Sequence, residues 1–179
     1  MMPTPPLLLM RHGKSDWSQD IADIDRPLKP RGRAASTAVA DWLGRTSLIP
    51  SSILTSPAAR TLQTAQIVQN RLQLPTCTVQ TDARIYGASD EMLRRVLAEF
   101  TTRNASTSRP GPLLLVGHNP GLEQLLQWLD PSQRPASDGK LIPTGTLAVL
   151  DGKAPLSELV RGWGHTRALV RPRSLRAPI

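Results

Sequence analysis

Residues Leu7–Gly13 read LLLMRHG, and this stretch decides the fold that we expect for the chain. A short apolar run bounded by proline and glycine is typical of a buried β-strand, because a helix would need a longer periodic segment. The strand would run from Leu7 to Met10, and Arg11, His12 and Gly13 follow it directly. A cation, an imidazole and a glycine are therefore expected together where a buried strand ends.

The same pattern recurs further along the chain. The segment Leu113–Gly121 reads LLLVGHNPG, a second apolar strand that ends at His118 and a helix-starting turn. Between the two, the short β-type run SSILT is followed by Ser56 and Pro57, which are typical of a helix start, with Arg60 in the first turn. Three strand ends therefore carry polar residues suited to binding an anion.

Strands and helices alternate along most of the chain. This order favours a three-layer αβα sandwich whose central sheet is mostly parallel, and ligands of such sheets bind at the carboxyl ends of the strands. Helices are expected over residues 32–45, 57–72, 90–103 and 120–129, and strands over 7–10, 51–55, 76–81, 113–116 and 147–150, with a last strand around 157–160. At 179 residues the chain is predicted to be a single domain over residues 1–179.

Composition narrows the choice of partners. The formal net charge of +8 favours anionic partners, whereas an aromatic content of 3% argues against a base-stacking nucleic-acid surface. The stretch from about residue 164 to 179 is basic, and we expect it to be a solvated tail. The apolar run near the N-terminus is too short for a signal-peptide core or a membrane span, so no membrane association and a cytoplasmic location are predicted.

The residues at the strand ends fit phosphoryl chemistry. A phosphoryl group carries negative charge that Arg11 and Arg60 could balance, because a guanidinium binds pairs of oxygens and stays protonated. The helix start at His118 and Asn119 would add N–H donors. His12 is a candidate nucleophile if one ring nitrogen is unprotonated, and His118 would serve better protonated, as a clamp on the phosphoryl group.

Taken together, these motifs resemble the histidine phosphatase superfamily, also called the phosphoglycerate-mutase-like family, and its SixA-like phosphohistidine phosphatases in particular. The resemblance extends from Leu7 to about Leu150. It is carried by MRHGKSDW at residues 10–17, DRPL at 25–28 with Arg31-Gly32, SPAARTLQTA at 56–65, Ile85-Tyr86, VGHNPG at 116–121 and PTGT at 143–146.

The resemblance implies a reaction and a set of residues. His12 would attack phosphorus and be phosphorylated during turnover, water would then hydrolyse the phosphoenzyme, and no metal or organic cofactor is implied. Arg11, Arg60, His118 and Asn119 would bind the phosphoryl group. The substrate would be a protein phosphorylated on histidine or a small phosphomonoester.

The general acid is the gap in this match. Larger members of the family carry a carboxylic acid that protonates the leaving oxygen, whereas here the matching region reads IYGASDEML, and Asp90 and Glu91 fit the next helix better. Asp16 and Asp25, in the loop after the first strand, are the remaining candidates. The loop aspartates Asp16, Asp20, Asp23 and Asp25 match no common metal-ligand spacing, so no metal site is predicted.

Two alternatives to a phosphohistidine phosphatase stay open. The first is a phosphatase of a small phosphorylated metabolite. Few residues between Arg60 and His118 are left to form a cap, which fits the SixA-like subgroup, and an uncapped pocket could admit either a side chain of a folded protein or a small metabolite. The second is a non-catalytic phosphate-binding module that uses its basic surface for docking. The sequence alone does not fix the oligomeric state.

Overall fold

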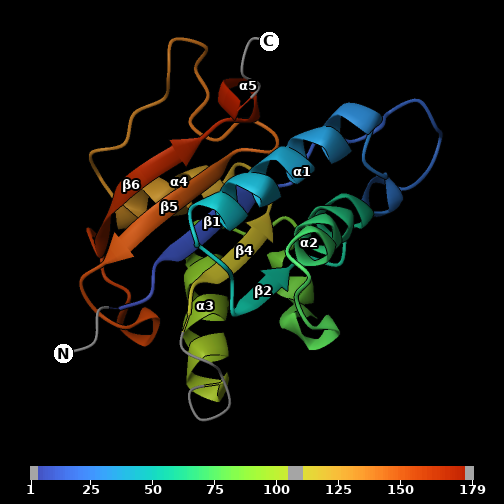
Figure 1. The fold of residues 1–179 in the computed structure, drawn as a ribbon. Coiled ribbons are helices and arrows are strands. Elements are labelled where there is room, and N and C mark those ends of the chain that lie inside the picture. Colours follow the sequence, from blue (N-terminus) through green and yellow to red (C-terminus); the bar gives the residue numbers. More distant parts are fainter. Residues whose placement is uncertain (1–3, 105–110, 176–179) are drawn as a thin grey trace.

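The computed structural model describes residues 4–104 and 111–175, apart from the side chain of residue 77. They form one six-stranded sheet in the order β3-β2-β4-β1-β5-β6, with helices on both faces (Figure 1). The strands are β1 (Leu7–Arg11), β2 (Ser52–Thr55), β3 (Val79–Thr81), β4 (Leu113–Gly117), β5 (Leu147–Gly152) and β6 (Gly164–Val170). The helices are α1 (Pro30–Arg45), α2 (Ala59–Arg71), α3 (Asp90–Asn104), α4 (Gly121–Leu129) and α5 (Pro172–Leu175), and short 3-10 turns are η1 (Asp23–Asp25), η2 (Thr76–Thr78), η3 (Ala83–Ile85) and η4 (Leu156–Glu158).

The predicted three-layer αβα sandwich with a mostly parallel sheet is confirmed. The neighbouring strands β3, β2, β4 and β1 are parallel, whereas β5 runs antiparallel to β1 and β6 antiparallel to β5. Because β1, β2 and β4 are parallel, their carboxyl ends lie at one edge of the sheet. The segments that carry His12, Ser56 and His118 follow these three strands and meet at that edge.

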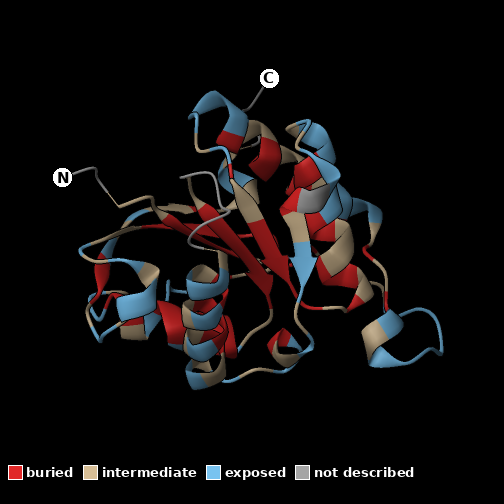
Figure 2. Cartoon of the chain, turned by 90° about the horizontal axis from the view of Figure 1, so that it is seen from below, coloured by how far each residue is buried: buried red, intermediate tan, exposed pale blue. Residues whose placement is uncertain are grey.

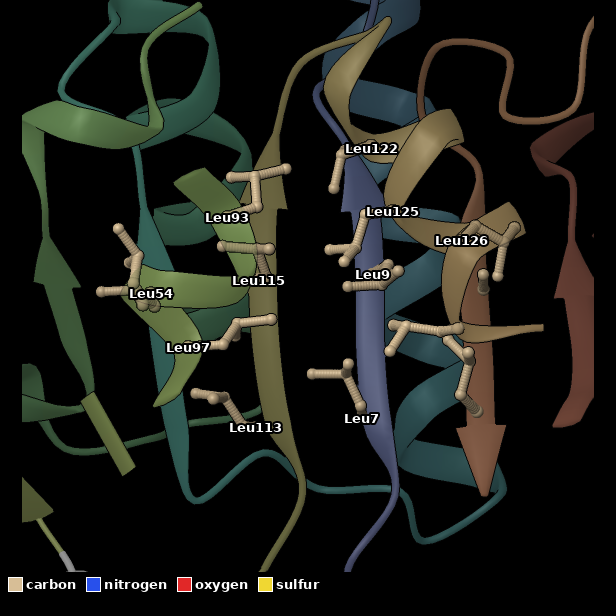
Figure 3. Packing of buried hydrophobic residues seen from close by; sticks show 14 of the residues in the cluster. Leu7, Leu9, Leu54, Leu93, Leu97, Leu113, Leu115, Leu122, Leu125 and Leu126 are labelled. Carbon is tan, nitrogen blue, oxygen red and sulfur yellow. The ribbon is translucent and has the colours of Figure 1, made fainter. Parts of the chain in front are cut away.

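The central strands are apolar on both faces, as the leucine run predicts. Leu7 and Leu9 face a cluster formed with α3 and α4, and Figure 3 shows them on one side of β1 beside leucines of those helices. Leu8 and Met10 face the opposite cluster, against α1 and α2. All four side chains are fully buried, and Figure 2 shows the strands as a buried layer between the helices. Helices on both faces thus explain why β1 needs no polar face.

The C-terminal segment differs from the prediction. The prediction of a strand around residues 157–160 is wrong. Pro155 is followed by η4, and the last strand of the sheet is β6. The basic stretch expected as a solvated tail is also largely structured. Residues 164–170 form β6, which pairs with β5, and α5 packs against α1. Residues 176–179 lie outside the described part.

Two boundaries are also corrected. The strand expected over residues 76–81 is reduced to β3, because residues 76–78 form η2. The helix expected from Pro57 begins at Ala59, and the Ser56 hydroxyl accepts a hydrogen bond from the Ala58 N–H at 3.1 Å. Among the described helices, none is long and apolar enough to cross a membrane.

Candidate active site

His12 lies directly after β1 with its ring held in one tautomer. Its side chain is buried, and Nδ1 lies 2.7 Å from the carbonyl oxygen of Gly13. Because that oxygen can only accept, the proton must sit on Nδ1, which leaves a lone pair on Nε2. The backbone is fixed as well, since the His12 N–H donates to Gly117 of β4 at 3.2 Å and the carbonyl accepts from the Gly145 N–H at 3.0 Å. His12 is thus held rigidly with one nitrogen available as a nucleophile.

Two glycines let the turn after His12 pass close to the start of α1. A Cβ built on Gly13 would lie 2.5 Å from the carbonyl oxygen of Gly32, and one built on Gly32 would lie 2.3 Å from the carbonyl oxygen of Lys14. Both neighbours are backbone atoms that cannot rotate away. The glycines of the RHG and RG motifs therefore serve one close contact between two backbone segments.

Arg11 and Asn119 reach the site from neighbouring strand ends. Both donate to the carbonyl oxygen of Ile142, Arg11 through Nη1 at 3.1 Å and Asn119 through Nδ2 at 2.9 Å. Ile142 belongs to the loop before β5. Glu123 holds this loop, because its Oε1 accepts hydrogen bonds from the N–H groups of Leu141 and Ile142 at 3.1 and 2.8 Å. Burial lowers the pKa of Arg11, and the charge of Glu123 opposes this shift. Glu123 thus positions the carbonyl that holds two predicted phosphate-binding residues.

Asp23 joins the other side of the site through three partners. Its Oδ1 accepts from Arg26 at 2.6 Å, and its Oδ2 accepts from Arg60 Nη2 at 2.9 Å and from the Tyr86 hydroxyl at 2.7 Å. Arg26 is buried, donates to the Ser15 hydroxyl and lies 3.4 Å from the ring centre of an exposed tryptophan. The carboxylate thereby orders two guanidinium groups that line the pocket.

His118 faces His12 across the pocket. The two ring centres are 5.2 Å apart, and a 2.9 Å hydrogen bond joins His118 Nε2 to the Ser56 hydroxyl. The rings of Tyr86 and His118 are nearly perpendicular, with 5.6 Å between their centres. Ser56 itself follows β2, so its position confirms that the second and third strand ends meet beside the first.

Both imidazoles are neutral at pH 7. Burial, with the nearby charges of Arg60 and Arg11, lowers the pKa of His12 to about 3, although its bond to the Gly13 carbonyl opposes the shift. Burial and the charge of Arg60 likewise lower the pKa of His118 to about 4. Without a ligand, His118 therefore lacks the positive charge that would suit a clamp on a phosphoryl group, because desolvation and the charge of Arg60 outweigh the charge of Asp23. A neutral His12 is the form that a nucleophile requires.

These side chains line a pocket of about 450 Å³. Arg11 Nε and Arg60 Nε are buried without a hydrogen-bond partner among the described residues, so both guanidinium groups retain unmet donors. The predicted residues that line the pocket are Arg11, His12, Arg60, His118 and Asn119, and the further lining residues include Lys14, Ser15, Trp17, Asp23, Arg26, Tyr86 and Thr144. Such a set can bind a tetrahedral anion and present a nitrogen nucleophile to it.

The acids expected from sequence lie elsewhere. Asp16 pairs with Lys29 at 3.7 Å, and Asp90 pairs with Arg94 on α3. Neither these two nor Asp25 and Glu91 line the pocket, and Asp23 was not singled out as a candidate. Its hydrogen bond from Tyr86, with those from the arginines, holds the pKa of Asp23 far below its usual range. It is therefore ionised at neutral pH and has no proton to donate.

One local signal could have identified Asp23. It stands three residues before Arg26, in the loop segment between the MRHGKSDW and DRPL motifs. That segment folds back on itself, since Ser15 pairs with Leu28 in an antiparallel bridge and the Asp16 N–H donates to Pro27. These contacts close the base of the loop over residues 15–28, and Asp23, near its tip, hydrogen-bonds to Arg60. Among the described residues, no group of three or more His, Cys, Asp or Glu side chains is placed to hold a metal ion.

Residues 7–88 match the histidine phosphatase superfamily (branch 1). An uncharacterized chloroplastic protein of Arabidopsis thaliana is 29% identical over 133 residues, which cover 69% of this chain and 58% of that protein. An uncharacterized protein of Mycobacterium tuberculosis is 34% identical over 115 residues, which cover 62% of this chain and 63% of that protein. The chain thus spans about three-fifths of the length of these curated relatives.

Several solved structures share the fold. The SixA protein from Agrobacterium tumefaciens is 27% identical, with a TM-score of 0.72 over 96% of this chain and 100% of that chain. The protein histidine phosphatase SixA complexed with tungstate is 22% identical, with a TM-score of 0.76 over 96% and 99%. A mycobacterial glucosyl-3-phosphoglycerate phosphatase is 20% identical, with a TM-score of 0.63 over 94% and 98%.

Proposed function

From the match of residues 7–88 to the histidine phosphatase superfamily and the fold shared with SixA proteins, we propose that the chain is a SixA-like histidine phosphatase, a metal-independent phosphatase of phosphohistidine on a protein. The observation that carries the proposal is the state of His12. Its Nδ1–H is bound to the Gly13 carbonyl, and its Nε2 lone pair belongs to a pocket that also contains Arg11, Arg60 and His118. A nucleophile and an anion-binding group are thus combined at one strand end.

The proposed reaction has two displacements at phosphorus. His12 Nε2 attacks in line, so that an N–P bond forms to the enzyme while the bond from phosphorus to the leaving group breaks. Water then attacks phosphorus, the N–P bond to His12 breaks, and inorganic phosphate leaves. Arg11 and Arg60 balance the charge on the equatorial oxygens in both steps, so the charge balance needs no metal.

Phosphohistidine suits this site because of its leaving group. The leaving group of phosphohistidine is an imidazole, which with a pKa near 6.5 can already carry a proton when the bond to phosphorus breaks. The leaving group of an alkyl phosphate is an alkoxide, which must receive a proton from an acid of the enzyme. The carboxylate in the pocket, Asp23, has a depressed pKa and cannot supply that proton at pH 7. The charge state of Asp23 therefore supports phosphohistidine over an alkyl phosphate.

Trapping the phosphoenzyme tests the proposal. With EDTA present, ³²P from a phosphohistidine peptide should label His12, and the label should be acid-labile, as phosphoramidates are. His12→Asn should abolish labelling and turnover, and Arg60→Ala should lower kcat/KM on the order of 10³-fold. The matched control is His165→Asn, because His165 is exposed on β6 outside the pocket. Near-normal turnover by His12→Asn would overturn the proposal.

A small phosphomonoester is the second candidate substrate. A pocket of about 450 Å³ is within the size range of small-molecule sites. A panel that compares phosphohistidine peptides with sugar phosphates at equal concentration separates the two. A higher kcat/KM for a sugar phosphate would reassign the substrate and retain the role of His12. Phosphate binding without turnover of any substrate would instead indicate a non-catalytic module.

A further inference from the structure

A second, larger hollow lies beside the catalytic pocket. It has a volume of about 870 Å³ and shares Arg11, Lys14 and Thr144 with the pocket. Its other lining residues come from three separate segments, namely the start of α1, the loop before β5 and the segment at α5. Figure 1 shows α5 close to α1 at the edge toward which β4 and β6 point. We name this feature the basic hollow.

The basic hollow is strongly cationic. Its cations are Arg11, Lys14, Arg31, Lys140, Arg171 and Arg173, against one carboxylate, Asp138. Asp138 lies 3.6 Å from Arg171, which also donates to the Lys140 carbonyl. Arg31, Lys140 and Arg173 have exposed side chains that form no ion pair with a described residue. This excess of unpaired positive charge raises the local concentration of an anionic partner.

The lining indicates what kind of anion fits. Sites for small molecules place a few buried polar groups in fixed positions, whereas Arg31, Lys140 and Arg173 are long, exposed and adaptable. A polar, solvent-accessible rim is typical of protein interfaces, and Arg is enriched in them. The described lining contains no aromatic side chain, so a nucleobase would find no surface on which to stack.

From this geometry we propose that the basic hollow docks an acidic segment of the protein substrate, next to the phosphohistidine that enters the catalytic pocket. The inference rests on the proposed function for its substrate. Lys14 and Arg11 belong to both cavities, so a chain in the hollow leads directly to His12. Carboxylates on that chain pair with Arg31, Lys140 and Arg173, and substrates with acidic residues beside the phosphohistidine are preferred.

The test compares two phosphohistidine peptides that differ only in Glu or Gln at the flanking positions. Wild type should show a kcat/KM about tenfold higher for the acidic peptide at low salt, since an exposed ion pair contributes up to about fivefold. The preference should vanish near 0.5 M salt, about where the Debye length falls to ~4 Å. The triple variant Arg31→Gln, Lys140→Gln, Arg173→Gln should lose the preference. Because the ratio is measured, a general loss of catalysis cancels.

A matched triple variant, Arg45→Gln, Arg103→Gln, Arg161→Gln, removes the same charge from exposed positions outside both cavities. It should retain the preference, and an equal loss in both triples would overturn the inference. The inference would also be overturned if the first triple variant kept the wild-type ratio of kcat/KM for the acidic and neutral peptides. The same holds if the enzyme preferred extra negative charge only in small substrates with two phosphates and not in the peptides.

A binding measurement separates this inference from the proposed function. The unphosphorylated acidic peptide should bind wild type about tenfold more tightly than it binds the first triple, and this comparison needs no catalysis. Binding without turnover of either phosphopeptide would refute the phosphatase assignment and retain the docking surface. Turnover of both phosphopeptides at equal rates would retain the phosphatase and refute docking.

Discussion

The two pocket histidines should make the protein lose stability as the pH falls from 7.5 to 5. Their pKa values are about 3 for His12 and about 4 for His118 in the folded chain, against 6.5 for a free imidazole. Between these limits the unfolded chain binds more protons than the folded chain, so the free energy of unfolding rises with pH. The contribution of the two neutral histidines to the free energy of unfolding is fully present above pH 6.5. It is lost progressively as the pH falls toward their pKa values in the folded chain.

The size of the effect follows from the two shifts. A pH of 5 is 1.5 units below the pKa of a histidine in the unfolded chain, so both histidines are protonated there, whereas in the folded chain they stay mostly neutral. This difference lowers the free energy of unfolding by about 2 kcal/mol per histidine. Both together should lower the free energy of unfolding by roughly 4 kcal/mol between pH 7.5 and 5. Aspartate, with an ordinary pKa of 3.8, titrates mainly below this window, so the carboxylates contribute little to the slope.

Urea unfolding followed by circular dichroism at pH 5.0, 6.0 and 7.5 measures this slope. His12→Gln and His118→Gln should each remove about half of it, because glutamine does not titrate. His165→Gln is the matched control for the loss of an imidazole outside the pocket, since His165 is exposed on β6. If both pocket variants kept the full slope, the histidines would not be buried in their neutral form, and the assignment of a free Nε2 lone pair would be wrong.

Three further substitutions test the supports of the site. Asp23→Asn removes a negative charge from the pocket and should tighten the binding of inorganic phosphate about tenfold, as measured by calorimetry; weaker binding would contradict this. Glu123→Ala frees the loop that holds Arg11, so kcat/KM should fall about tenfold, with Glu123→Gln between it and wild type, and an unchanged kcat/KM would exclude this positioning role. Gly32→Ala would place a methyl 2.3 Å from a backbone oxygen and should cost about 2 kcal/mol in urea unfolding, whereas Gly44→Ala, which meets only a leucine methyl, should not destabilise the protein.

The sequence predicted the central sheet because the decisive strands are buried on both faces. Such strands appear as uninterrupted apolar runs, and LLLM and LLLV are of this type. The strand β6 was missed because it lies at an edge, where exposed positions are occupied by His165 and Arg167 and the basic character of the segment hides its alternation. An edge strand is fixed by its pairing with β5, and no local pattern reveals that pairing.

The site likewise divides into residues that the sequence predicted and contacts that depend on the tertiary structure. Each predicted residue lies at a strand end, directly after it or in the first turn of the following helix, so the topology alone brings Arg11, His12, Arg60, His118 and Asn119 together. The partners of Asp23 depend instead on the path of a loop, since Arg60 and Tyr86 are 37 and 63 residues away in sequence. The spacing of Asp23 and Arg26 is a local signal, but the contacts of Asp23 with Arg60 and Tyr86 need the closed base of the loop, which no residue type signals.

The charge of His118 shows most clearly what depends on the three-dimensional structure. A histidine beside a phosphate site is expected to be cationic, yet burial and the neighbouring cation Arg60 keep His118 neutral in the ligand-free pocket. A phosphoryl group that enters brings negative charge close to that ring, and an opposite charge within a few ångströms raises the pKa of an imidazole. His118 can therefore become a cation as the ligand binds, while its hydrogen bond to Ser56 holds the ring in place beforehand. In the proposed reaction, burial would thus keep His12 in the neutral form that attack requires, and His118 would gain charge only when a phosphoryl group is present.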